Sequence, residues 1–94
     1  MTFDDAVYSS FRMIQEMPVF YLYEMQEAQY IAACLDFNEA LERDESREEL
    51  LAHCRKILRL GKTVCNRKST IGATPMFKDI YHGLKRQADA GEFD

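Results

Sequence analysis

The chain of 94 residues contains no tryptophan, two prolines, four glycines and three cysteines. So few prolines and glycines, in a sequence that is 47% hydrophobic and 30% charged, exclude a disordered tail and a fibrous protein. A chain of this length has room for one hydrophobic core and little room for a second domain. We therefore predict a single folded domain over residues 1–94.

The cysteines are too few and too scattered for a disulfide framework or a structural zinc site. Cys34, Cys54 and Cys65 lie in apolar segments, and no two of them are separated by two to four residues. Small secreted domains carry denser cysteine patterns, and zinc sites use closely spaced ligand pairs. We interpret these residues as buried thiols of a protein in a reducing cytosol, and we predict no metal and no cofactor.

No apolar run is both long enough and free enough of charge to cross a membrane. The longest apolar stretch, residues 18–37, contains Glu24, Glu27 and Asp36. The first residues are acidic, whereas the start of a secretory signal peptide is basic. The expected location is the cytoplasm, and a membrane partner is not expected.

Apolar residues recur at helical spacing in four segments. The predicted helices cover about residues 3–16, 18–43, 47–66 and 75–90. Pro18 and Pro75 suit the first turn of a helix, and Ser46 followed by Glu49 has the spacing of a capping box. The sequence therefore predicts an all-α fold with about four helices in a compact antiparallel arrangement like a bundle. Surplus apolar surface on the second helix favours a homodimer, and the sequence alone does not decide between monomer and dimer.

Residue types that serve in catalysis or metal binding are present, but their spacing does not match that of known sites. Glu49 and His53 are four residues apart and form such a pair only once, whereas ferritin-like metal sites use two helices with a spacing of three. Cys54 follows His53 directly, and adjacent side chains on a helix point about 100° apart. The Gly-Lys-Thr at residues 61–63 lacks the earlier glycine of a phosphate-binding loop. We predict no catalytic residues and no enzymatic activity.

Aromatic and apolar side chains around residues 21–30 exceed what a small helical core holds. The chain has six Phe and five Tyr, and tyrosine and methionine are enriched where proteins meet. The side chains that cannot all point inward are Tyr8, Met13, Tyr21, Leu22, Tyr23, Met25, Tyr30 and Leu60. From this set and the acidic residues that follow it we predict a partner-binding surface of Tyr21, Tyr23, Met25, Tyr30, Glu39, Glu42 and Glu45.

Charge is divided unevenly between the two halves of the chain. Residues 1–49 carry 12 acidic and 3 basic side chains, whereas residues 50–94 carry 4 and 9. An acidic rim beside tyrosine and methionine anchors suits a small protein that covers the basic surface of a protein partner, as an inhibitor or adaptor. Acidic helical inhibitors, immunity proteins and phage-encoded anti-host or anti-defence proteins share this size and composition, which is a likeness of class rather than of any motif.

A basic segment favours an alternative. Six basic residues and no acidic residue lie within residues 55–68. Contacts with nucleic acid would come from Arg55, Arg59, Lys62, Arg67 and Lys68, as in a small transcriptional regulator. The connection to the last helix is about eight residues long, whereas a helix-turn-helix has a tight turn. The same segment could instead face the acidic half of its own chain, and both interpretations stay open.

Overall fold

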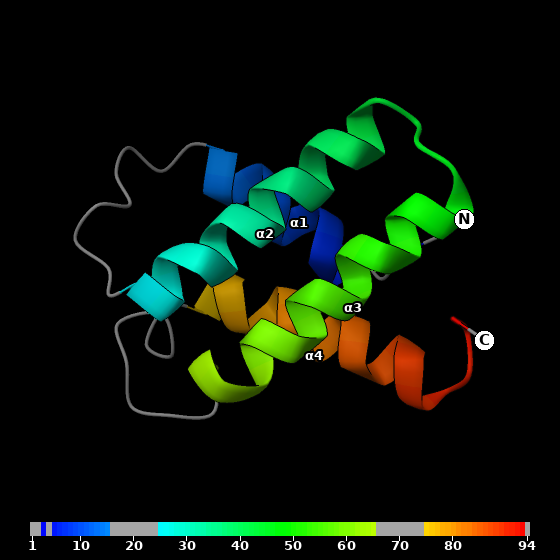
Figure 1. The fold of residues 1–94 in the computed structure, drawn as a ribbon. Coiled ribbons are helices and arrows are strands. Elements are labelled where there is room, and N and C mark those ends of the chain that lie inside the picture. Colours follow the sequence, from blue (N-terminus) through cyan, green and yellow to red (C-terminus); the bar gives the residue numbers. More distant parts are fainter. Residues whose placement is uncertain (1–2, 4, 16–24, 66–74, 94) are drawn as a thin grey trace.

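The computed structural model describes residues 3, 5–15, 25–65 and 75–93. They form four α-helices, which are α1 (Asp5–Gln15), α2 (Met25–Glu42), α3 (Arg47–Val64) and α4 (Pro75–Asp89) (Figure 1). Every regular element within these ranges is helical, which confirms the predicted all-α class. The predicted helix ends at Glu16, Pro18 and Asn66 lie outside the described residues, and the other predicted ends lie within two residues of the observed ones.

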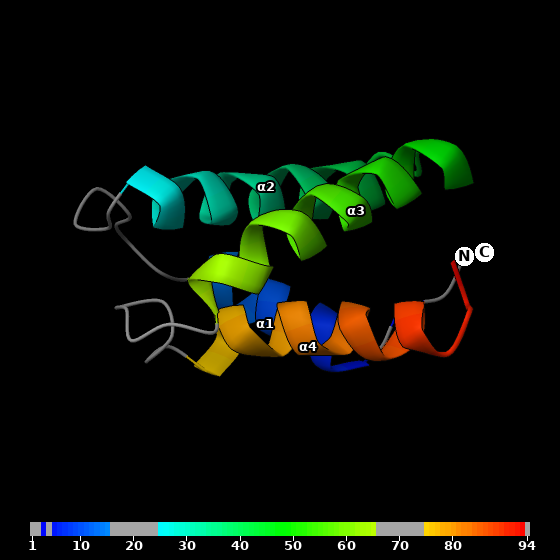
Figure 2. The same cartoon turned by 60° about the horizontal axis from the view of Figure 1, so that its bottom comes forward.

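The four helices form one compact body arranged in two layers. In Figure 2, α2 and α3 lie side by side in one layer, and α1 and α4 lie in the other. The most extensive packing joins α2 to α3 and α1 to α4, whereas α1 has little contact with α2. The radius of gyration is 12.3 Å, which agrees with the value of about 12 Å expected for a compact domain of this length.

The end of α2 is closed by two backbone hydrogen bonds that reverse the chain. The Asp44 N–H donates to the Leu41 carbonyl (3.2 Å), and the Glu45 N–H donates to the Ala40 carbonyl (3.1 Å). This pair of bonds is the Schellman pattern, and it requires a left-handed residue just after the helix. Asp44 provides that conformation with φ of 54°, and aspartate tolerates it better than most residues.

The start of α3 is capped as its sequence predicts. Ser46 has an extended backbone, and its Oγ accepts a hydrogen bond from the Glu49 N–H (3.3 Å). This bond satisfies one of the free N–H groups in the first turn of the helix. Four residues therefore connect α2 to α3, and the two helices form an antiparallel pair, called here the α2–α3 hairpin.

Aromatic rings fill the space between the layers. Phe37 of α2 is fully buried, and its ring centroid lies 5.0 Å from that of Phe3 and 5.4 Å from that of Phe11. Phe3 also lies 6.2 Å from Phe93 at the other end of the chain. Close ring pairs of this kind stabilise a core beyond the effect of their buried area.

All three cysteines are free and buried, as the sequence predicts. Burial disfavours the charged thiolate and raises the pKa of Cys54 to about 12. Burial also raises the pKa of Cys34 and of Cys65. In each case the folded state favours the neutral thiol more strongly than the unfolded chain does.

These thiols make stability depend on pH on the alkaline side. A thiol in the unfolded chain ionises near pH 8.5, so its contribution is complete below that pH and is lost as pH rises toward the folded pKa. We expect Cys54 alone to lower the free energy of unfolding by about 1–2 kcal/mol between pH 8.5 and pH 10. Urea unfolding at the two pH values measures the loss, and it should be smaller in Cys54→Ala. If the free energy of unfolding falls equally in Cys54→Ala and in the unaltered chain, ionisable groups other than Cys54 cause the loss.

Candidate functional site

The structure places Tyr30 in the core rather than on the predicted partner-binding surface. Its side chain is 0% exposed, and its hydroxyl donates a hydrogen bond of 2.6 Å to the Phe77 carbonyl at the start of α4. Burial raises the pKa of Tyr30 well above its ordinary value. Tyr30 therefore ties α2 to α4 and is not available to a partner.

Several other residues of the predicted sites lie outside the part of the chain that can be described. Tyr21 and Tyr23 belong to this group, as do Arg67 and Lys68. Met25 begins α2, but its side chain is not described. The predicted aromatic cluster of the second helix therefore stays a prediction at these positions.

The described part of α2 presents a polar outer face. Its large apolar side chains are buried, as Ile31 and Phe37 are, or partly buried, as Leu35 and Leu41 are. Its exposed residues are Gln26, Ala28, Gln29, Ala32, Asp36, Glu39 and Glu42. Among all described residues the one exposed large hydrophobic side chain is Tyr8 of α1. Apart from Tyr8 and the half-buried Phe93, the aromatic rings whose burial is described therefore belong to the core.

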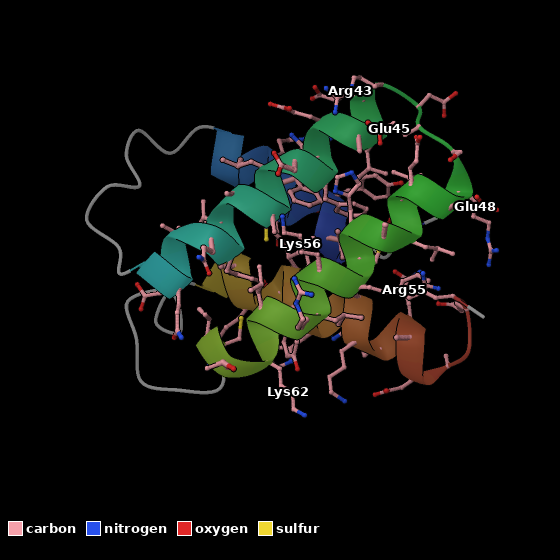
Figure 3. All side chains as sticks on the ribbon, viewed as in Figure 1. Arg43, Glu45, Glu48, Arg55, Lys56 and Lys62 are labelled. Atoms are coloured by element: carbon pink, nitrogen blue, oxygen red, sulfur yellow. The ribbon has the colours of Figure 1, made fainter. Side chains whose placement is uncertain are left out.

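Carboxylates gather at the turn of the α2–α3 hairpin. Residues 36–49 contain seven acidic side chains and two arginines. Glu39 and Glu42 face solvent as predicted, and Glu48 is exposed at the start of α3 (Figure 3). These residues form the acidic end of the hairpin, and their potential favours cationic partners.

Glu45, the third predicted acidic residue, has a different role. Its side chain is 22% exposed, and its Oε2 accepts a hydrogen bond from Arg43 Nε (3.2 Å) and lies 3.0 Å from Arg43 Nη2. Its Oε1 lies 3.6 Å from Nε2 of His53. Glu45 thus joins the turn to α3 and fixes the shape of the acidic end, while part of its charge is neutralised.

A groove lies beside this end, where α1 meets the hairpin. Its volume is about 300 Å³, and it is lined by Tyr8, Leu41, Asp44, Glu45, Arg47 and Leu50. The Tyr8 ring is 41% exposed, and its other side meets Phe3 in an edge-to-face contact with centroids 6.3 Å apart. Sequence reasoning counted Tyr8 among the surplus rings but did not place it in the site, because only the fold brings α1 next to the turn.

Basic residues lie on α3 from its middle toward the open end of the hairpin. Arg55, Lys56 and Arg59 are exposed on α3, and none of them takes part in an ion pair found within the described ranges. Figure 3 shows Lys56 between α2 and α3 and Lys62 further from the acidic end. A second hollow of about 330 Å³ lies here, lined by Gln29, Ala32, Lys56, Arg59 and Leu60.

Comparisons with protein-family models, with curated proteins and with solved structures found no match to this chain. Within the described ranges, no helix is long and apolar enough to span a bilayer. The same residues contain no group of three or more His, Cys, Asp or Glu side chains that could hold a metal ion.

Proposed function

We propose that this chain is a small non-enzymatic protein that binds another protein and covers a basic surface on it. The observation that supports this most is the groove at the acidic end, where the exposed Tyr8 ring and the exposed Asp44 line the same hollow, together with Arg47. A lysine or arginine of the partner could rest on the ring and pair with a carboxylate at the same time. This combination binds a cationic side chain better than scattered surface acids do.

The two parts of this site would contribute differently. Exposed carboxylates such as Glu39 and Glu42 attract a basic surface over a distance and speed association, but each exposed ion pair adds only about 0.2–1 kcal/mol. A tyrosine that becomes fully covered is a typical hot spot, worth about 2 kcal/mol or more. Tyr8 is therefore the proposed anchor. The exposed carboxylates around it favour a partner with a positively charged surface.

Covering a partner's surface in this way is the action of an inhibitor or adaptor. A host protein in the cytoplasm is a suitable partner for a chain of this size and charge, if the chain comes from a phage or another mobile element. The sequence also predicts a homodimer, and the outer face of the α2–α3 hairpin is the described surface that best suits one.

If the groove is the binding site, substitution of its residues should lower the affinity for the partner. We expect the unaltered chain and Asp79→Asn, which removes one exposed carboxylate of α4, to retain the same partner in affinity capture. Tyr8→Ala combined with Asp44→Asn should weaken that partner at least about tenfold, measured on the purified pair. Asparagine accepts the left-handed backbone of residue 44, so the turn is preserved.

Retention of that partner with equal affinity by all three proteins would contradict the proposal. A partner with an acidic surface at the point of contact would contradict it as well, because the rim would then repel it. Circular dichroism of each variant checks that the helices are intact.

A second candidate function is binding of nucleic acid through α3. It is favoured by one observation, that Arg55, Lys56 and Arg59 are exposed and take part in none of the ion pairs within the described ranges. Contacts with phosphates would make the affinity for a short DNA duplex fall linearly with the logarithm of salt concentration. Absence of binding to the duplex at about 100 mM salt would exclude this function.

A further inference from the structure

The outer face of the α2–α3 hairpin is uncovered and includes exposed alanines among its charged side chains. No described element lies on this side of the layer formed by α2 and α3 (Figure 2). The exposed residues along its middle include Ala28, Ala32 and Ala52, which allow another helix to approach closely. Each helix has 18 residues and is therefore about 27 Å long.

Charge on this face is polarised along the helices. Exposed carboxylates lie toward the turn, with Asp36 and Glu39 on α2 and Glu48 on α3, and they outnumber the two arginines there, of which Arg43 lies 3.9 Å from Glu39. Lys56 lies at the middle of α3 and Arg59 lies beyond it toward the open end. Figure 3, which looks onto this face, shows Glu48 at the turn end and Lys56 and Lys62 progressively further from it. The turn end of the hairpin is therefore net acidic, and the other half of α3 is basic.

We propose that two copies of this chain associate through this face in an antiparallel arrangement. A twofold axis that lies in the face and runs across the helices reverses the long axis of the hairpin. It places the acidic end of each copy on the basic end of the other and sets α3 antiparallel to α3. Every favourable contact in such an interface forms twice, because a twofold interface is self-complementary.

The hollow on the basic half gives this arrangement a place for a carboxylate. Its lining includes the cations Lys56 and Arg59 and the small side chain of Ala32. Neither cation takes part in the ion pairs found within the described ranges. An acidic side chain such as Glu39 of the second copy supplies the missing negative charge, and the shielded position strengthens the pair.

The distribution of charge on this face also favours a second copy over a nucleic acid as its binding partner. A polyanion laid along the whole face would meet Asp36, Glu39 and Glu48 at one end and be repelled there. A second copy meets both ends with opposite charge. The face covers about 500 Å² per copy, from its length of about 27 Å and the width of two helices, so we expect a weak dimer that salt dissociates.

Charge reversal with rescue tests the arrangement. Lys56→Glu with Arg59→Glu makes both ends acidic, and Glu39→Lys with Glu48→Lys makes both ends basic. Each double variant alone should dimerise at least about tenfold more weakly than the unaltered chain, because like charges now meet. An equal mixture of the two should recover association, since each acidic end then meets a basic end.

Sedimentation velocity at about 100 μM protein, in 50 mM and 500 mM salt, provides the measurement, with circular dichroism as the check on folding. A mass of 11.0 kDa for the unaltered chain in 50 mM salt would overturn the proposal. Undiminished association of either double variant, or a mixture that stays monomeric, would overturn it too. So would a monomeric chain whose binding to a DNA duplex is lost in the Lys56→Glu and Arg59→Glu variant, which would assign the face to nucleic acid. The assay contains no protein partner, so its outcome is independent of the acidic groove.

Discussion

Tyr30→Ala is expected to unfold the protein or to lower its free energy of unfolding by about 3–5 kcal/mol. The side chain is completely buried, so its removal leaves a cavity between α2 and α4 in addition to the lost apolar burial. It also removes the donor of the 2.6 Å hydrogen bond to the Phe77 carbonyl. A small domain has only about 5–15 kcal/mol of stability in total, so this loss is a large part of it.

Tyr30→Phe separates the hydrogen bond from the packing. This variant keeps the ring and loses the donor, so it should cost about 1–3 kcal/mol. Urea unfolding followed by circular dichroism measures both variants, and Tyr8→Ala serves as the control because Tyr8 is partly exposed. A Tyr30→Ala variant as stable as that control would show that the ring is not part of the core.

Gly61→Ala is expected to destabilise the protein by about 1–3 kcal/mol, against the usual direction of this substitution. Alanine normally stabilises a helix interior by about 1 kcal/mol relative to glycine. Here the added Cβ would lie 2.6 Å from Cδ2 of Tyr81 and 3.0 Å from Cε2 of Tyr30. Both rings are buried, and Tyr30 is also held by its hydrogen bond, so neither can move aside cheaply.

Thr63→Ala is the matched control for this prediction. Residue 63 lies on the same helix, and its side chain is exposed, so the higher helix propensity of alanine should raise stability by a few tenths of a kcal/mol. Urea unfolding of both variants should therefore show changes of opposite sign. A Gly61→Ala variant at least as stable as the unaltered chain would show that the helices α2, α3 and α4 do not meet closely at this residue.

The helices themselves could be predicted from local signals. The period of apolar residues identified all four segments, and Ser46 at the head of α3 identified a cap that the structure confirms. These signals involve residues within one or two turns of each other, so they do not depend on the tertiary fold. The second helix was harder, because its apolar residues lie nearly all round and no single face is marked as the inner one.

The candidate site could be predicted only in part, because its geometry depends on the fold. The acidic end follows directly from the sequence, since consecutive carboxylates around a turn stay together. The pairing of Glu45 with both Arg43 and His53 could not be predicted, nor could the exposure of Tyr8 beside the turn. Tyr30 was misplaced for the same reason, since its partner Phe77 lies 47 residues away along the chain.

The pairing of the first helix with the last has a consequence for biosynthesis. During translation α1 leaves the ribosome first, but the helix that covers it is made last, and α2 covers little of it. Phe3 and Phe11 can contact Phe37 once α2 is made, but most of the packing of α1 is with α4 and forms only after α4 has been synthesised. A polypeptide that terminates before α4 would leave the apolar face of α1 accessible to chaperones, proteases and other nascent chains.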